Sequence, residues 1–206
     1  MVVQPLTRQR ILEAAFRQAD EQGLESVTMR SVAAQLGVEA MSLYHHVPNK
    51  KAMMDGLVDL LVQVAELPSG ELTVEQWIRG TAKGLRSLAQ RHPRLVPLFT
   101  TRTIPLDDAR SARPFESGMS AFCRTGKDVA GGFAAVQSVL LSLVALTQLE
   151  ATATLQDGTE EQTALSDLAE AEFPLLIQVL DADVGPDAFW DTLVDALVKG
   201  LDSHTT

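Results

Sequence analysis

The 206-residue sequence is poor in the side chains that form disulfides and bind metals: it has one cysteine, Cys123, and four histidines. A single cysteine cannot form an intramolecular disulfide or a multi-cysteine metal site, and this usage fits a reducing cytoplasm. His45 and His46 are adjacent, and neighbouring positions on a helix point about 100° apart, so they cannot chelate one ion well. We therefore expect no metal site and no cofactor.

Signatures of catalysis are also missing, since the sequence has no G-x-S-x-G, no phosphate-binding glycine loop and no HExxH. Cys123 with His92 could form a nucleophile and its base, but a lone cysteine in a helix is usually a small apolar filler. We expect that the protein is not an enzyme.

Long uninterrupted apolar runs are absent as well. The N-terminal residues MVVQPLTRQR lack the continuous apolar core of a signal peptide. The longest apolar stretch, 133–149, is interrupted by polar side chains, so we interpret it as a buried helix rather than a membrane span. These features predict a cytoplasmic protein that has no membrane partner.

Charge is distributed unevenly along the chain, whose formal net charge is −10. Residues 1–52 hold six cations and five carboxylates, a net charge of +1, so the remainder carries −11. An acidic body with a near-neutral head can still bind DNA if a few cations face the phosphates. The overall acidity therefore does not exclude a nucleic-acid partner.

The stretch from Thr28 to Lys50 predicts two short helices around a tight turn. Thr28 can cap the first helix, Gly37 stands where that helix must stop, and Pro48 ends the second at about Val47. Paired across a sharp turn, two such helices match the helix-turn-helix that places its second helix in a DNA major groove.

Before this stretch, the sequence predicts a helix at 7–22 that Thr7 caps. The three helices would form a head at residues 1–52, with a core made of Phe16, Val32, Leu36, Val38, Leu43 and Val47. Asn49 can cap a fourth helix that runs to about Glu66. Because no flexible linker precedes this helix, a shift of its far end would move the helix that reads DNA.

Residues 53–206 predict a larger helical body without strands. We expect a helix from Thr73 to just before Pro93, a short helix at 94–102 that Pro97 interrupts, and a loop that contains Pro105 and Pro114. Further helices are expected at 115–125, 128–153, 164–181 and 186–202. The fold class is therefore all-α, with a helix-turn-helix head followed by a ligand-binding and dimerisation body.

The residues that match a known pattern are Thr28, Arg30, Ala33, Leu36-Gly37-Val38, Leu43-Tyr44, His46-Val47 and Asn49-Lys50. They resemble the DNA-binding segment of the tetracycline-repressor (TetR) family of bacterial transcription regulators. The resemblance implies an all-α homodimer whose ligand-binding body controls a DNA-binding head. It also implies that the long 128–153 helix and the last helix pair with their copies, although a C-terminal helix can also simply close its own core.

The candidate DNA contacts divide into two groups. Arg30, Met41, Ser42 and His45 are candidates for base edges, since Arg can bond guanine and Met can touch a thymine methyl. Thr28 belongs to the matching motif, and the resemblance implies that Tyr44, His46 and Lys50 bind the DNA backbone. The competing interpretation makes Tyr44 and His46 half-buried helix residues and Lys50 a solvated charge.

A small-molecule site in the body would need an apolar wall with a few amides. The candidates to line it are Trp77, Phe99, Phe115, Met119, Phe122, Phe133, Gln137, Gln148 and Phe173. The alternative is that these residues are plain core. Tetracycline-binding relatives use histidines and a glutamate around a magnesium–drug complex, and no histidine occurs here in the fourth helix or in residues 94–110. We therefore expect a small apolar effector rather than a magnesium–tetracycline complex.

Two functions remain from the sequence. The first is a homodimeric repressor that a small molecule releases from double-stranded operator DNA, with activation in place of repression also open. The second is a helical small-molecule carrier or enzyme whose helix-turn-helix serves packing only.

Overall fold

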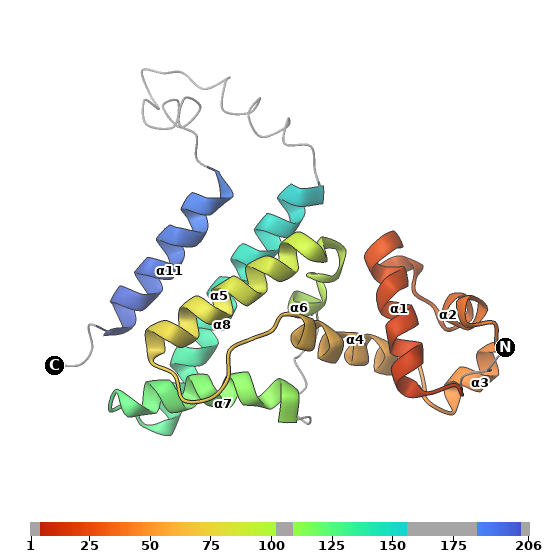
Figure 1. Ribbon diagram of the computed structural model, residues 1–206, viewed down its shortest axis with the longest axis horizontal. Coiled ribbons are helices and arrows are strands. Elements are labelled where there is room, and N and C mark those ends of the chain that lie inside the picture. The colour runs from red at the N-terminus through yellow and green to blue at the C-terminus, as the bar shows by residue number, and fades with distance from the viewer. Residues whose placement is uncertain (1–4, 102–108, 156–184, 203–206) are drawn as a thin grey trace, which may run out of the picture.

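The computed structural model describes residues 5–101, 109–155 and 185–202 (Figure 1). This part of the chain is helical and contains no strand, which confirms the all-α fold. Its α-helices are α1 (Arg8–Gln22), α2 (Met29–Leu36), α3 (Ala40–Tyr44), α4 (Lys50–Val64), α5 (Val74–Arg91), α6 (Leu98–Thr101), α7 (Ala109–Arg124), α8 (Val129–Leu155) and α11 (Pro186–Asp202). Two short 3-10 helices, η1 (Leu24–Ser26) and η2 (Pro93–Leu95), accompany them.

Four helix starts lie where the capping residues predicted them. The side chains of Thr7 and Asn49 accept from backbone N–H groups three residues on, at 3.2 and 2.8 Å. Thr28 accepts from the Ser31 N–H at 3.0 Å, and the Ser31 side chain bonds the Thr28 N–H in return. Thr73 begins α5 with the same reciprocal arrangement. Each cap satisfies N–H groups that the first helical turn leaves unpaired.

The helix-turn-helix forms from α2 and α3. Gly37 ends α2 in the left-handed conformation, with φ 68° and ψ 31°, which a residue without Cβ adopts at little cost. Val32, Leu43 and Val47 are fully buried, and the other predicted core residues Phe16, Leu36 and Val38 pack against the same cluster. Helix α3 is shorter than expected, because it ends at Tyr44 before a turn.

The prediction for α7 was wrong at its start. This helix begins at Ala109 and contains Pro114, which was expected in a loop. Proline removes one backbone donor from a helix, but the Pro114 carbonyl accepts a hydrogen bond from Trp77 Nε1 at 2.8 Å, which fixes α7 against α5. This tertiary contact outweighs a local signal that favours a loop. The helix expected at 164–181 lies outside the described residues.

The body packs α5, α7, α8 and α11 around a second core that includes Trp77, Phe122, Val136 and Trp190. Figure 1 shows the head at one end, with α4 running from it toward the body and α11 at the far side. Helix α8 is long and apolar enough to cross a membrane by length and composition, with a mean hydropathy of 2.0. It packs on α5 and α7, with further contacts to η2 and α11, and Leu141 on its outward face is 71 % exposed.

Candidate nucleic-acid interface and ligand cavity

The candidate DNA-reading residues lie on the outer surface of α2, α3 and the start of α4. Leu43 and Val47 turn inward and seat α3 on the head. The three residues between Leu43 and Val47 in the sequence, Tyr44, His45 and His46, are exposed. Met41 is 69 % exposed, although a methionine with a packing role would be buried. The inward pair thus leaves the rest of α3 available to a partner.

The cations at this surface differ in their partners. Arg30 and Lys50 are exposed and form no ion pair within the described part of the chain. Lys51 is bonded to Asp55 at 2.7 Å, in a pair four residues apart on α4. Thr28 is exposed but uses its hydroxyl in the cap of α2, and Ser42 is half-buried. Arg30 and Lys50 are therefore the cations whose charge is open to an anion.

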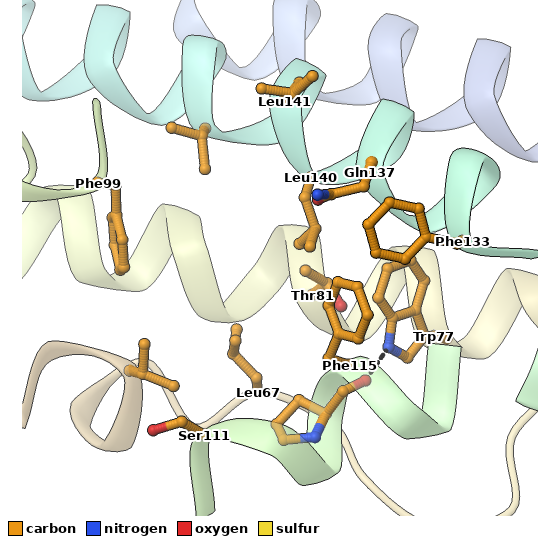
Figure 2. A pocket seen from close by; sticks show the side chains of 13 residues that line it. Leu67, Trp77, Thr81, Phe99, Ser111, Phe115, Phe133, Gln137, Leu140 and Leu141 are labelled. Carbon is orange, nitrogen blue, oxygen red and sulfur yellow. Dashed lines mark hydrogen bonds between the residues drawn. The ribbon is translucent and has the colours of Figure 1, made fainter. Parts of the chain in front are cut away.

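A cavity of about 350 Å³ lies in the body between α4, α5, α7 and α8. This volume is at the lower end of the range for small-molecule sites. Figure 2 shows its side chains, which come from these four helices, from α6 and from the turn after α4. The lining residues are Val62, Leu67, Trp77, Thr81, Phe99, Ser111, Pro114, Phe115, Phe133, Gln137, Leu140, Leu141 and Val144.

Four aromatic rings form much of the cavity wall. Phe115 and Phe133 meet edge to face, with ring centroids 5.8 Å apart and planes at 62°. Trp77 lies on the same side of the cavity as these two rings in Figure 2, and Phe99 lies at the opposite end. Because the Trp77 N–H already bonds the Pro114 carbonyl, its indole offers the cavity an apolar surface.

The structure brings five of the candidate ligand residues together around this cavity: Trp77, Phe99, Phe115, Phe133 and Gln137. Three others stand outside its lining. Phe122 is fully buried against Trp77, at a centroid distance of 6.1 Å, Met119 packs on the same core, and Gln148 lies further along α8. Phe173 lies outside the described residues.

Sequence reasoning missed the two hydroxyl groups of the cavity wall, Thr81 and Ser111. Both are buried, and neither hydroxyl has a hydrogen-bond partner. A signal for Thr81 existed, because it follows Trp77 by four residues and so shares the core-facing side of α5. No comparable signal existed for Ser111, which lies in the segment expected to be a loop.

Helix α4 connects the two sites directly. It begins at Lys50 beside the exposed surface of α3, and Val62 near its other end lines the cavity. The 15 residues of α4 span about 22 Å at the rise of an α-helix. A molecule that displaces Val62 therefore displaces a helix that starts at the candidate DNA-reading surface.

Comparison with known proteins gives three kinds of match. The model of a family described as bacterial regulatory proteins, tetR family, matches residues 11–57. An HTH-type transcriptional regulator of Saccharopolyspora erythraea is 30% identical over 203 residues, which cover 95% of this chain and 84% of that protein. Tetracycline repressor protein class D of Escherichia coli is 29% identical over 98% of this chain and 91% of its own length. The solved structure of the Streptomyces coelicolor TetR family protein ActR in complex with actinorhodin matches with a TM-score of 0.83 and 20% identity, over 98% of this chain and 99% of that one.

Proposed function

The chain belongs to the TetR family of bacterial regulatory proteins, and we propose that it holds its operator as a homodimer with one α3 helix in each of two successive major grooves. It is a ligand-responsive, DNA-binding transcriptional repressor, and its Escherichia coli relative is a tetracycline repressor protein. The two α3 helices would stand ~34–36 Å apart on a pseudo-palindromic site. The alternative of a carrier or enzyme whose helix-turn-helix only packs is not favoured by this membership.

The observation that carries the DNA assignment is the outward set of side chains on α2, α3 and the start of α4. We assign Arg30, Met41, Ser42 and His45 to base edges, and Tyr44, His46 and Lys50 to the backbone. Apart from Ser42, which is half-buried, these side chains are exposed, while Leu43 and Val47 pack α3 onto the head. Thr28 would contribute indirectly, through the cap that fixes the start of α2.

The regulatory assignment rests on the cavity and α4. We propose that residues 1–52 form the DNA-binding head, that residues 53–206 form the effector-binding and dimerisation body, and that an apolar effector enters the cavity. Pressure on Val62 would then change the separation of the two α3 helices. A differential affinity of about 1–3 kcal/mol per effector would weaken operator binding 5–150-fold.

The dimer assignment is supported by apolar side chains that the single chain leaves exposed. Leu141 and Leu149 on α8 are 71 % and 53 % exposed, and Phe189 on α11 is 49 % exposed. We propose that these two helices pair with their copies, which would cover the open face of α8 in place of a membrane. The operator lies in the cytoplasm of a bacterium, so that is where we place the protein.

The test uses the double variant Tyr44→Ala/Lys50→Ala and DNA from upstream of the protein's own gene. We expect weaker binding to most sequences, and a log–log slope against salt that falls by about 1, because a phosphate contact is lost. Lys51→Ala is the matched control, since the neighbouring lysine is already paired with Asp55. If the folded double variant held the DNA as tightly as the wild type in matched salt, the DNA assignment would be wrong.

A further inference from the structure

We propose that the effector is an uncharged polycyclic aromatic molecule that carries two separate oxygen groups, one bonded to the Thr81 hydroxyl and the other to the Ser111 hydroxyl. This inference rests on the proposed function, because it takes the cavity as the effector site. It adds the chemical class of the ligand and the two side chains that select it.

The absence of charge follows from the side chains of the wall. Among the described residues that line the cavity, none is ionisable. A separate surface hollow contains the ionisable residues Glu66, Arg110 and Arg113. It shares Val62, Leu67 and Pro114 with the lining of the cavity. An ionised ligand would therefore lose its hydration without meeting an opposite charge, which is strongly unfavourable.

The aromatic character follows from the rings and their arrangement. Trp77, Phe115 and Phe133 gather at one end of the cavity and Phe99 stands at the other, so a planar ligand can contact rings at both ends (Figure 2). Aromatic pairs of this kind contribute beyond the burial of their area. Leu140 and Val144 of α8 add apolar side chains to the same wall.

The two oxygen groups follow from the unpaired hydroxyls. Elsewhere in the described helices, serine and threonine hydroxyls commonly bond the carbonyl four residues earlier: Ser117 at 2.9 Å, Ser138 at 2.8 Å, Thr147 at 2.6 Å and Thr152 at 2.9 Å. Thr81 is 1 % exposed and does not bond its helix in this way. A buried hydroxyl without a partner is rare in native proteins and calls for an explanation.

The second hydroxyl lies elsewhere in the cavity. Ser111 is 4 % exposed, belongs to α7 rather than α5, and is also without a partner. Figure 2 shows Ser111 on the opposite side of the cavity from Gln137, with Thr81 apart from both. One polar group cannot serve two separated hydroxyls, so the ligand needs two. Since a hydroxyl both donates and accepts, carbonyl and phenol oxygens are equally suitable partners.

The experiment compares three probes built on one three-ring frame: anthraquinone, which has two carbonyls, anthracene, which has none, and anthraquinone sulfonate, which carries an added charged group. Binding is measured without DNA, by quenching of tryptophan fluorescence and by thermal shift. The variants Thr81→Val and Ser111→Ala remove one hydroxyl each. Their matched controls are Thr147→Val and Ser117→Ala, which remove buried hydroxyls that are already bonded within the protein.

We expect wild-type protein to bind anthraquinone more tightly than anthracene, and to bind the sulfonate most weakly. Each of Thr81→Val and Ser111→Ala should weaken anthraquinone binding by about 10-fold and leave anthracene binding unchanged. Free Thr81→Val protein should melt no lower than wild type, because the substitution removes an unpaired buried hydroxyl. The two control variants should bind anthraquinone as the wild type does.

Three results would overturn the proposal: wild-type protein that binds none of the probes, tight binding of the sulfonate, or anthraquinone binding that neither hydroxyl affects. None of these three results changes the outcome of the operator-binding assay with Tyr44→Ala/Lys50→Ala. Failure of the ligand class and failure of the DNA-binding function are therefore distinguishable.

Discussion

At the scale of single residues, Gly118 controls the shape of the cavity. A Cβ at this position would lie 2.5 Å from Cε2 of Trp77, closer than real Cβ contacts come. The indole is also held by its bond to the Pro114 carbonyl. Alanine at 118 therefore has to push the Trp77 ring away from α7 or separate α7 from α5.

We expect Gly118→Ala to lower the free energy of unfolding by about 1–3 kcal/mol, as overpacking of a core does, and to weaken anthraquinone binding. Urea denaturation and fluorescence titration measure the two effects. The control is Gly200→Ala on α11, where an added Cβ meets no atom within 4 Å and helix propensity favours alanine. An unchanged anthraquinone affinity in Gly118→Ala would contradict this placement of Trp77.

The same scale shows why some residues were predictable and others were not. Thr28 and Asn49 act on N–H groups a few positions away, so a local pattern suffices to identify them as caps. Trp77 and Phe122 have the same apolar character in the sequence, yet only Trp77 faces the cavity. Whether a buried ring lines a cavity depends on how all the surrounding helices pack. The sequence of one helix does not contain that information.

At the scale of elements, α1 of the head is joined to the body by a second connection besides α4. His92 at the end of α5 places its Nδ1 2.9 Å from Oδ2 of Asp20, and its ring meets Phe16 edge on, with centroids 5.2 Å apart. Arg94 of η2 adds a bond to the Asp20 carbonyl. Movement of α5 can therefore reach the head without passing along α4.

We expect His92→Ala to lower the free energy of unfolding by about 1–2 kcal/mol, because it removes both the pairing with Asp20 and the ring contact. His45→Ala is the matched control: His45 is exposed on the proposed DNA-reading surface, so this variant should keep its stability within about 0.5 kcal/mol and lose operator affinity. Denaturation and gel shift of both variants give the comparison. Equal effects of the two substitutions on stability would show that the His92 contact contributes nothing.

One buried carboxylate, Glu150, contributes to the attachment of α11 to the body. Glu150 of α8 is 7 % exposed and accepts hydrogen bonds from Arg86 Nε at 3.2 Å, from Gln90 Nε2 at 2.9 Å and from the Trp190 indole. The hydrogen bond to Asp187 is the main cause that raises the pKa of the Arg86 guanidinium, and the bond to Glu150 adds to it. Through Glu150 and Asp187, the Arg86 guanidinium links α5 to α8 and α11.

Glu150→Leu should lower the free energy of unfolding by about 2–4 kcal/mol, because it leaves the Trp190 N–H unpaired and removes a charge partner of Arg86. Thermal and urea unfolding measure this loss. Glu75→Leu is the control, because Glu75 forms an exposed ion pair with Arg79 on the surface of α5. This substitution should change the free energy of unfolding by less than about 0.5 kcal/mol. A Glu150→Leu protein as stable as Glu75→Leu would refute the role of this cluster.

The elements themselves were largely predictable, with α7 as the exception. Helices α1, α2, α4 and α5 begin after the capping residues that the sequence displays, and α11 begins with Pro186. The start of α7 could not be predicted, because Pro114 favours a loop locally and the contact that keeps it helical comes from Trp77, 37 positions away.

At the scale of the whole molecule, α8 shows how an apolar sequence can serve two surfaces. Its residues are apolar on nearly every side, and only 28% of its most apolar window is buried within one chain. The buried face packs on α5 and α7, while Leu141, Leu149 and small residues between them form the open face. Exposed apolar residues along one helix face favour a partner on that face, and a second copy of the chain provides the same face.

We therefore expect Leu149→Glu to halve the molar mass measured by light scattering, because pairing through this face would bury a carboxylate without a partner. Leu149→Met, which keeps volume and polarity, should remain dimeric.

Loss of the second α3 helix removes the gain of binding two linked half-sites, so operator affinity should fall by about 10²–10⁴-fold while each head remains folded. Circular dichroism separates this outcome from unfolding. A folded Leu149→Glu protein that stays dimeric would move the dimer surface away from the open face of α8, and the link between cavity and operator would then need another route between the two heads.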